Sequence, residues 1–361
     1  MTQVDFPAHG GDLEYARRVF GEPATGWQDL STGVSPWVYP VAEVPADVWQ
    51  RLPGNNDDLC QAADDYYGVA ANAVVPVPGS QVAIARIPHL VTPGRVAIPT
   101  LGYSGHSQAW RAAGHTVTTY STFEELLLLL QREAVEHVVL VNPNNPTGER
   151  FGVDFIRQVC QALDGRGVVL LDEAFADAFP ELSATDLLDE FPDLWILRSM
   201  GKFFGLAGLR LGFLLGQGEL ANQLSESLEP WGISHPAQWL GSRALRDRDW
   251  QHTQRLRIQA AEQALVQLWR DYLSGGFSVR SAGLFVTLQG DGKTLFDLYQ
   301  ALGQRGLFLR WCDWSDEAMG EHTQPWLRCG LPDDGGARLQ QALAELACTQ
   351  PDYTTTQAHT L

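Results

Sequence analysis

Short, mostly apolar runs alternate along the first two thirds of the chain with segments in which apolar positions recur every three to four residues. The short runs predict buried strands, and they lie at residues 74–77, 96–99, 137–141, 167–171 and 194–197. The periodic segments predict helices, and they lie at residues 57–67, 107–113, 123–134 and 153–163. Because apolar strands separated by helices are typical of a mostly parallel sheet covered on both faces, the pattern predicts an α/β domain.

The pattern changes after about residue 231. A long helical stretch at 236–272 precedes a strand-like run at 283–288 and a helix at 294–305, which predicts a smaller α+β domain. Residues 2–39 are rich in Gly and Pro and are expected to be irregular. The expected divisions are an N-terminal arm that joins the small domain (1–36), a large domain (37–230), the small domain (231–348) and a flexible tail (349–361).

Composition and charge narrow the class of protein. The 361 residues are 45% hydrophobic and 19% charged, and 43 acidic against 25 basic residues give a net charge of −18. Because no Lys/Arg block occurs, we expect no nucleic-acid partner, and the N-terminus does not resemble a signal peptide. The longest aliphatic run, 126–130, is too short to cross a membrane. The five scattered cysteines lack C-x-x-C spacing, which predicts a reducing, cytoplasmic location and no metal site.

Polar residues follow three of the predicted strands directly, at 142–148, 172–175 and 199–202. The carboxyl ends of parallel strands meet at one edge of a sheet, and sites in such sheets form there. Lys202 lies among small and apolar residues, where its pKa would fall and its amine would become a nucleophile. A lysine on a solvated loop is more common, so Lys202 alone does not decide the function.

Other candidates also have a simpler explanation when each is taken alone. Asp172 would pair with a protonated cofactor ring nitrogen, or it forms a structural ion pair. The junction at 79–81 offers free backbone N–H groups to a phosphate, or it is a helix start without a ligand. Arg210 would suit a phosphate as well. The turn around Asn145 aims the side-chain amide, or it is a plain turn.

Taken in order, these segments resemble the fold type I pyridoxal-phosphate enzymes of the aspartate and histidinol-phosphate aminotransferase superfamily. The shared motifs are Gly-Ser-Gln, Asn-Pro-x-Asn-Pro-Thr-Gly, Asp-Glu-Ala-aromatic, Ser-x-x-Lys and Gly-x-Arg, at 79–81, 142–148, 172–175, 199–202 and 208–210. The resemblance implies a large domain with a mainly parallel seven-stranded sheet, a smaller α+β domain, pyridoxal 5'-phosphate as cofactor and a homodimer.

Finer features are similar to the threonine-phosphate decarboxylases of cobalamin biosynthesis. They include His-Gly-Gly at 9–11, Leu-Ser-Thr-Gly-Val-Ser-Pro at 30–36 and Leu-Arg-Cys-Gly-Leu-Pro at 327–332. That family converts a small phosphorylated amino acid, L-threonine O-3-phosphate, into (R)-1-amino-2-propanol O-2-phosphate and carbon dioxide. The alternative is an aminotransferase acting on histidinol phosphate or a related amino acid, because residues alone do not show which bond breaks.

The resemblance gives each candidate a role. Lys202 would hold the cofactor as a Schiff base, and Asp172 would pair with the ring nitrogen. Asn145 would donate to the ring oxygen, and Arg328 would bind the substrate carboxylate. The groups holding the cofactor phosphate would be Gly79, Ser80, Gln81, Ser199 and Arg210. The candidates for the substrate phosphate are His9, Gly10 and the 31–35 loop that contains Gly33.

The chain also departs from many relatives. Phe175 replaces a Tyr whose hydroxyl assists aminotransferases at the ring oxygen, which would favour decarboxylation. Leu52 stands where many relatives have a Tyr that reaches the cofactor of the partner subunit, and Gly201 stands where they have Ser or Thr. Either Tyr103 or His106 would stack on the cofactor ring.

Overall fold

The computed structural model describes residues 6–7, 9–41, 43–273, 276–312, 315–316, 321–322 and 325–349. The chain divides into a larger unit, residues 37–145 and 149–255, and a smaller unit, residues 1–36, 146–148 and 256–361. The predicted domain boundary near residue 230 lies ahead of helix α9 (His235–Arg246), which belongs to the larger unit. Beyond residue 349, the predicted tail lies outside the described residues.

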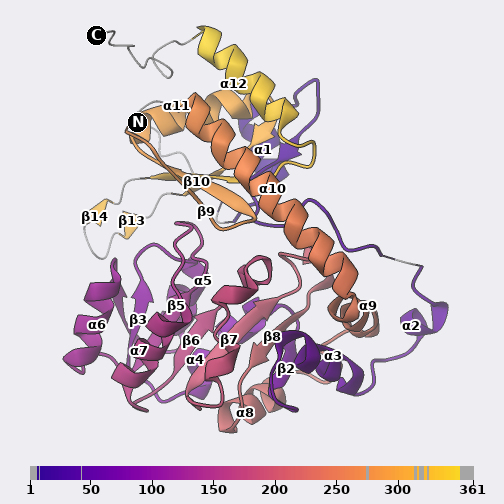
Figure 1. Ribbon diagram of the computed structural model, residues 1–361, viewed down its shortest axis with the longest axis vertical. Helices are drawn as coiled ribbons and strands as arrows, with labels where there is room; N and C mark the ends of the chain where they lie inside the picture. The colour runs from indigo at the N-terminus through magenta and orange to yellow at the C-terminus, as the bar shows by residue number, and fades with distance from the viewer. Residues whose placement is uncertain are drawn as a thin grey trace. The chain divides into compact units, whose positions relative to one another are not determined.

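The larger unit contains a seven-stranded sheet with the strand order β2-β8-β7-β6-β5-β3-β4 (Figure 1). Its strands are β2 (Val74–Val77), β3 (Arg95–Pro99), β4 (Thr116–Tyr120), β5 (His137–Val141), β6 (Val169–Asp172), β7 (Leu194–Ser199) and β8 (Gly212–Leu215). Strand β8 runs antiparallel to both neighbours, and the other pairings are parallel. The predicted α/β unit with a mainly parallel sheet is confirmed.

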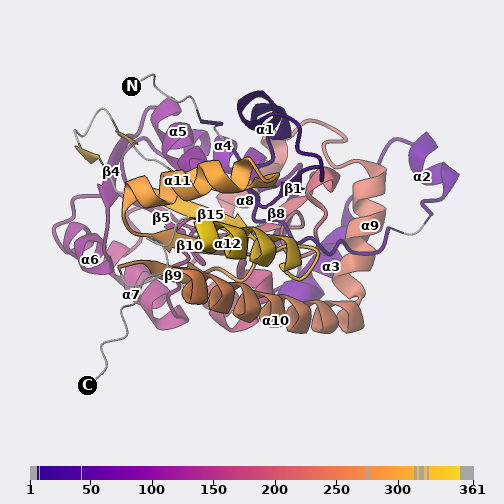
Figure 2. The same ribbon diagram turned by 90° about the horizontal axis from the view of Figure 1, so that it is seen from above.

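Helices pack around this sheet. They are α2 (Ala46–Gln50), α3 (Asp57–Tyr67), α4 (Ser80–Leu90), α5 (Ser104–Ala112), α6 (Phe123–Gln131), α7 (Val153–Leu163), α8 (Glu219–Ser227) and α9, with short 3-10 turns η1 (Ala176–Ala178), η2 (Pro180–Leu182), η3 (Thr185–Leu187) and η4 (Ala207–Leu209). Local sequence sets their ends: Gly68, at φ 68°, closes α3, and Thr122 with Glu125 forms a capping box that starts α6. Helices α4, α5 and α8 contribute to one core cluster with the sheet, and the fully buried Trp110 belongs to it. Figure 2 shows α2 at the margin of the unit, beside α9.

The smaller unit is built on a four-stranded antiparallel sheet with the order β12-β15-β10-β9. These strands are β9 (Ser278–Ser281), β10 (Phe285–Gln289), β12 (Arg310–Cys312) and β15 (Trp326–Gly330). Two short pairs accompany them, β1 (Gln28–Asp29) with β11 (Leu307–Phe308), and β13 (Ser315–Asp316) with β14 (Glu321–His322). The helices are α1 (Leu13–Phe20), α10 (Arg248–Tyr272, which begins in the larger unit), α11 (Gly292–Gly303) and α12 (Ala337–Thr349).

Some local predictions are wrong. The N-terminal segment is not irregular throughout, because Asp12 accepts a hydrogen bond from the Tyr15 backbone N–H at 2.9 Å and so caps α1. The predicted helix at 236–272 is two helices, because Asp247 interrupts it and accepts from the Trp250 N–H at 3.0 Å. Strands β4 and β8 and helix α12 were not anticipated. Within the described ranges, the helices are too short or too polar to span a bilayer.

Candidate active site

The carboxyl ends of three neighbouring strands bring the predicted cofactor residues to one edge of the larger sheet. Strands β5, β6 and β7 are adjacent and parallel, so the segments that follow them begin side by side. The Asn142 backbone N–H donates to the Asp172 carbonyl at 2.9 Å, so the hydrogen bonding between β5 and β6 continues one residue beyond the end of β5. The predicted convergence of residues 142–145, 172–175 and 199–202 follows from this arrangement.

Asp172 ends β6 and is 5% exposed, and its Oδ2 lies 3.0 Å from Nε2 of the wholly buried His106. Its Oδ1 accepts a hydrogen bond from the Ala174 backbone N–H at 3.0 Å. An ionised carboxylate only accepts hydrogen bonds, so Nε2 of His106 would be the donor to an ionised Asp172. Nδ1 of His106 is buried and, among the described residues, has no hydrogen-bond partner. The carboxylate is thus fixed in a place with little water, where a cationic ring nitrogen would be a suitable partner.

The structure separates the two aromatic candidates. Tyr103 precedes α5 and His106 lies in its first turn, with the ring centres 6.1 Å apart. The Tyr103 hydroxyl donates to Oε1 of Gln81 at 2.7 Å, and the Tyr103 side chain is partly exposed. The His106 ring has no exposed face to offer a ligand. The geometry therefore favours Tyr103 as the ring that stacks and His106 as the residue that orients Asp172.

The N-terminus of α4 forms a cradle for an anion. Gly79 precedes the helix with φ 82°, and no side chain caps the first turn, which begins at Ser80. A Cβ on Gly79 would lie 2.6 Å from Nη2 of Arg210, so glycine is required for the guanidinium to lie there. Uncapped N–H groups, the helix dipole and an arginine together suit a phosphate. These residues fit the phosphate of pyridoxal phosphate.

The segment after β7 carries the candidate lysine. Oγ of Ser199 accepts a hydrogen bond from the Gly201 backbone N–H at 3.3 Å. Nζ of Lys202 lies 5.4 Å from the centre of the Phe175 ring. A Cβ on Gly201 would lie 3.2 Å from Cα of Ala207, so the Ser or Thr of relatives would need that backbone to move. Gly201 is therefore explained by close packing of this turn.

Two other asparagines hold the turn that carries Asn145. Nδ2 of Asn142 donates to the Phe151 carbonyl at 2.9 Å, and its Oδ1 accepts from the Phe151 N–H at 3.1 Å. Nδ2 of Asn144 donates to the Leu101 carbonyl at 2.7 Å. These hydrogen bonds hold the turn in place. Asn142 and Asn144 therefore have a structural role that is separate from the role predicted for Asn145.

The predicted substrate residues belong to the smaller unit, whereas the predicted cofactor residues belong to the larger one. Arg328 on β15 is 7% exposed, and its Nη2 donates to the Ser31 carbonyl at 2.6 Å. Oγ of Ser31 accepts from the Gly11 N–H at 2.7 Å and donates to Asp29 at 2.6 Å. Burial lowers the pKa of Arg328. The N-terminal loop thus holds this arginine in a desolvated position, where an anionic ligand would be bound strongly.

The other substrate candidates lie in the N-terminal loops of the same unit. His9 is exposed, Gly10 is partly exposed and Gly33 is buried. A Cβ on Gly10 would lie 2.3 Å from the Ser31 carbonyl oxygen, so Gly10 permits the two loops to pack closely. Contacts of His9, Gly10 and Gly33 with a substrate stay predictions.

Arg310 is a further candidate, which the sequence alone did not indicate. It lies on β12 directly opposite Arg328 on β15, and it donates to the Pro7 carbonyl. Like charges at directly opposed positions repel one another, and Arg310 contributes to lowering the pKa of Arg328, after burial. An anion near both guanidinium groups would relieve this repulsion. In the sequence, Arg310 only ends an apolar run at 306–310; the strand register identifies it.

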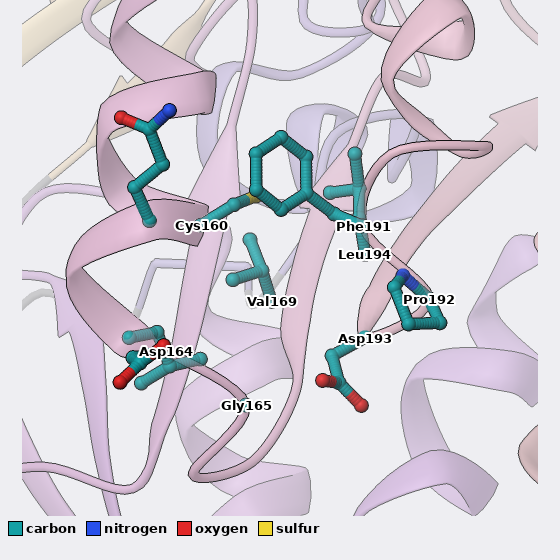
Figure 3. A pocket seen from close by; sticks show the side chains of 10 residues that line it. Cys160, Asp164, Gly165, Val169, Phe191, Pro192, Asp193 and Leu194 are labelled. Carbon is teal, nitrogen blue, oxygen red and sulfur yellow. The ribbon is translucent and has the colours of Figure 1, made fainter.

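A hollow of about 280 Å³ lies at the opposite edge of the larger sheet (Figure 3). The end of α7 and the starts of β6 and β7 line it, with Cys160 and Phe191 among the lining side chains. Burial raises the pKa of Cys160 to about 12, so its thiol is a poor nucleophile. Because none of the predicted site residues lines this hollow, it is separate from the candidate site.

Known proteins resemble the chain along its length. A sequence profile described as "Aminotransferase class I and II" matches residues 50–329. The threonine-phosphate decarboxylase of Pseudomonas aeruginosa is 39% identical over 347 residues, which cover 96% of this chain and 99% of that protein. The threonine-phosphate decarboxylase of a Sinorhizobium species is 32% identical over 359 residues, 94% of this chain and 98% of that protein.

A solved structure shows the same fold. The histidinol-phosphate aminotransferase of Sinorhizobium meliloti, solved in complex with pyridoxal-5'-phosphate, superposes with a TM-score of 0.79. Its sequence is 23% identical to this one, and the match covers 93% of this chain and 94% of that one. The predicted fold type I architecture is thereby confirmed.

Proposed function

The chain belongs to the class I and II aminotransferase family, and from this membership we propose that it is a pyridoxal-phosphate-dependent threonine-phosphate decarboxylase. It would convert L-threonine O-3-phosphate into (R)-1-amino-2-propanol O-2-phosphate and carbon dioxide, in cobalamin biosynthesis. Relatives that match nearly its whole length are named for this activity. The structural observation that carries the proposal is the cross-strand pair of Arg310 and Arg328. Two arginines suit a substrate that has both a carboxylate and a phosphate.

The alternative, a histidinol-phosphate aminotransferase, fits this pair less well. Histidinol phosphate has a phosphate but no carboxylate, so one of the two arginines would lack its anion while that substrate is bound. Phe175 also offers no hydroxyl beside Lys202. The two activities are separated by incubation with each phosphorylated amine in turn, with and without 2-oxoglutarate. Glutamate that forms from 2-oxoglutarate when histidinol phosphate supplies the amino group supports the alternative, whereas (R)-1-amino-2-propanol O-2-phosphate formed without any 2-oxo acid supports the decarboxylase.

The larger unit would hold the cofactor. When bound, pyridoxal phosphate supplies a protonated ring that withdraws electrons from a bond at the substrate Cα. Asp172 would keep the ring nitrogen protonated, since its carboxylate is fixed by His106 and by a backbone N–H. Asn145 would donate to the ring oxygen, and Tyr103 would cover one ring face. Asp172 would thereby support the electron withdrawal, whereas Asn145 and Tyr103 would orient the ring.

Phosphate binding and covalent attachment would fall to the ends of two other elements. Gly79, Ser80 and Gln81 would donate backbone N–H groups from the start of α4. Arg210 would neutralise charge beside Gly79, and Ser199 would add a hydroxyl. The Lys202 amine would bind the cofactor aldehyde covalently and later serve to move a proton at the substrate Cα.

The smaller unit would orient the substrate. A decarboxylase would have to hold the substrate carboxylate in the orientation in which its bond to Cα can break. Arg328 would hold it with two parallel hydrogen bonds. Arg310 would bind the phosphate, together with His9, Gly10 and the loop containing Gly33. The substrate would then be held at both its carboxylate and its phosphate, and these two contacts would fix its orientation.

We also propose that the protein is a homodimer. Large apolar side chains on and beside α2 are exposed: Val38 (51%), Val41 (59%), Trp49 (67%) and Leu52 (68%). Several exposed, large apolar side chains within one short segment are typical of a surface that a partner covers, and a second copy of the chain is the partner expected in this family. A Trp49→Ser/Leu52→Ser variant would then be monomeric by light scattering, while the wild type is dimeric.

We place the protein in the cytoplasm. All five cysteines are free thiols, which supports a reducing compartment. Fractionation of a producing cell would test this location directly.

A further inference from the structure

A buried ion cluster lies behind the proposed cofactor residues. The Arg198 side chain on β7 is 4% exposed. Its Nη1 donates to Glu173 at 2.6 Å, and its Nη2 donates to Asp177 at 2.6 Å. Its guanidinium also lies 4.6 Å from the centre of the Tyr67 ring. None of these residues is part of the proposed cofactor contacts.

The cluster is adjacent in sequence to the cofactor residues. Glu173 follows Asp172 directly, and Arg198 precedes Ser199 directly. Successive side chains of a strand point to opposite faces, so an acid that faces the site is followed by one that faces away from it. The Glu173 N–H donates to the Leu197 carbonyl at 3.0 Å, which joins the two strand ends through the backbone as well.

Asp177 extends the cluster to the turn that carries Phe175. Asp177 accepts from the Tyr66 hydroxyl at 3.1 Å, and its backbone carbonyl accepts from Nε of Arg255 at 3.0 Å. One guanidinium therefore fixes the ends of β6 and β7 and the start of η1 together. These segments carry the acid, the phosphate ligand and the ring beside Lys202.

Further hydrogen bonds hold Glu173, whereas Oδ2 of Asp177 and Nε of Arg198 are buried without a hydrogen-bond partner among the described residues. Glu173 is wholly buried and accepts from the Ser183 hydroxyl and the Ala184 N–H, each at 2.8 Å. Burial raises the pKa of Glu173, and Arg198 acts against that rise. Burial acts to lower the pKa of Arg198, but Asp177 and Glu173 raise it above its ordinary value. Removal of the guanidinium would leave two acids buried without their cation, so these segments would have to rearrange.

We propose that Arg198 is a positioning residue for the cofactor: through Glu173 and Asp177 it sets the orientation of Asp172 and Ser199. The proposal rests on the proposed pyridoxal-phosphate function. It differs from a purely structural role in what it predicts for protein that is still folded. A misplaced Asp172 would change the protonation of the bound ring and the rate of the reaction, whereas a structural ion cluster would change stability alone.

The test compares Arg198→Met and Arg198→Lys with the matched control Arg157→Met. Arg157 pairs with Glu190 at the surface of the same unit and its side chain is 38% exposed. Each variant is loaded with pyridoxal phosphate. Cofactor affinity, the pH midpoint of the visible absorption band, kcat and KM are then measured. For Arg198→Met we expect kcat to fall about 10- to 100-fold with KM changed much less, a weaker cofactor affinity and a shifted pH midpoint. Arg198→Lys should recover part of each loss, and Arg157→Met should match the wild type.

The proposal is overturned if folded Arg198→Met matches Arg157→Met in cofactor affinity, pH midpoint and kcat and differs only in melting temperature. If Arg198→Met does not fold, Asp177→Asn replaces it, since this variant keeps the volume and removes one charged bond. The same shifts at smaller size support the proposal, and unchanged cofactor properties overturn it. A wild-type protein that binds no pyridoxal phosphate would instead contradict the proposed function itself, so the two failures are distinguishable.

Discussion

Nε2 of His106 lies 3.0 Å from Oδ2 of Asp172, and the histidine is wholly buried. The contact joins the first turn of α5 to the end of β6, so it depends on the packing of the larger unit. With Nε2 as the donor, this hydrogen bond would favour a carboxylate at Asp172, which is the form that pairs with a protonated ring nitrogen.

Loss of this hydrogen bond should weaken the site without removing it. For His106→Phe we expect kcat to fall about 10- to 100-fold, since a hydrogen bond to a charged group contributes about 1.5–3 kcal/mol. Steady-state kinetics and the visible band of the bound cofactor measure the effect. His89→Asn, at an exposed histidine near the end of α4, is the control. Unchanged kinetics in His106→Phe would show that Asp172 does not depend on this donor.

Gly79→Ala should damage the phosphate cradle specifically. A Cβ at this position meets the Arg210 guanidinium at 2.6 Å, in addition to the strain of φ 82°. Gly68→Ala is a matched control, because Gly68 has φ 68° with open space around its Cβ position. Gly68→Ala should lose about 1–2 kcal/mol of stability from its left-handed backbone, and Gly79→Ala about 1–3 kcal/mol, because φ 82° with ψ 144° lies in a region that is almost restricted to glycine. Only Gly79→Ala should also lose cofactor affinity, by about tenfold or more; equal affinities in the two variants would place the phosphate elsewhere.

The arginine pair should control substrate binding and not cofactor binding. Arg328→Gln and Arg310→Gln should each raise KM for L-threonine O-3-phosphate by about 10- to 100-fold, because each removes charged hydrogen bonds to an anion. The visible band of the cofactor should stay the same. Arg280→Gln, at an exposed position on β9, should leave KM unchanged. If Arg328→Gln or Arg310→Gln keeps the wild-type KM, the arginine that it replaces does not bind the substrate.

Stability should fall in mild acid because of a buried histidine in the core. Nδ1 of His137 accepts from the Val168 N–H at 3.2 Å, and its Nε2 faces the Thr92 carbonyl at 2.9 Å, an arrangement of the neutral ring. Burial lowers the pKa of His137 below its ordinary value of about 6.5. The unfolded chain therefore binds the proton more readily, and the free energy of unfolding should decrease as pH falls from about 6.5 towards the lowered value.

Urea denaturation at a series of pH values measures this effect. His137→Gln should be less stable at neutral pH and should show a flatter dependence on pH in that window. His252→Gln, at an exposed histidine, should keep the wild-type slope. If His137→Gln shows the same dependence of the free energy of unfolding on pH as the wild type, other groups cause the loss of stability in acid.

The strongly apolar strands were predictable, because β5, β6 and β7 are buried on both faces and consist mostly of apolar residues. The edge strand β4 was not, because its Thr-rich sequence Thr116–Tyr120 is only half buried and lacks that signal. Helix α1 was missed because Gly and Pro around it obscured the capping signal of Asp12.

The residues of the candidate site were likewise predictable only in part. Asp172 and Lys202 follow recognisable strands, and their order along the chain was informative. The choice between Tyr103 and His106 as the ring that would stack on the cofactor rests on the burial of the two side chains. Their three-residue spacing in the sequence does not reveal this burial. Arg310 became visible only through the register that places it opposite Arg328. Arg198 was not predicted, because the sequence does not reveal which acids pair with a single basic residue at the end of an apolar strand.

The central claim is that this protein breaks the bond between Cα and the carboxylate of a phosphorylated amino acid. The most direct measurement is release of labelled carbon dioxide from L-threonine O-3-phosphate that carries the label in its carboxyl group, with pyridoxal phosphate present and no 2-oxo acid. The wild type should release label in step with formation of (R)-1-amino-2-propanol O-2-phosphate, and Lys202→Ala should release none. Retention of the label in the substrate, with the cofactor bound to the wild type, would contradict the account.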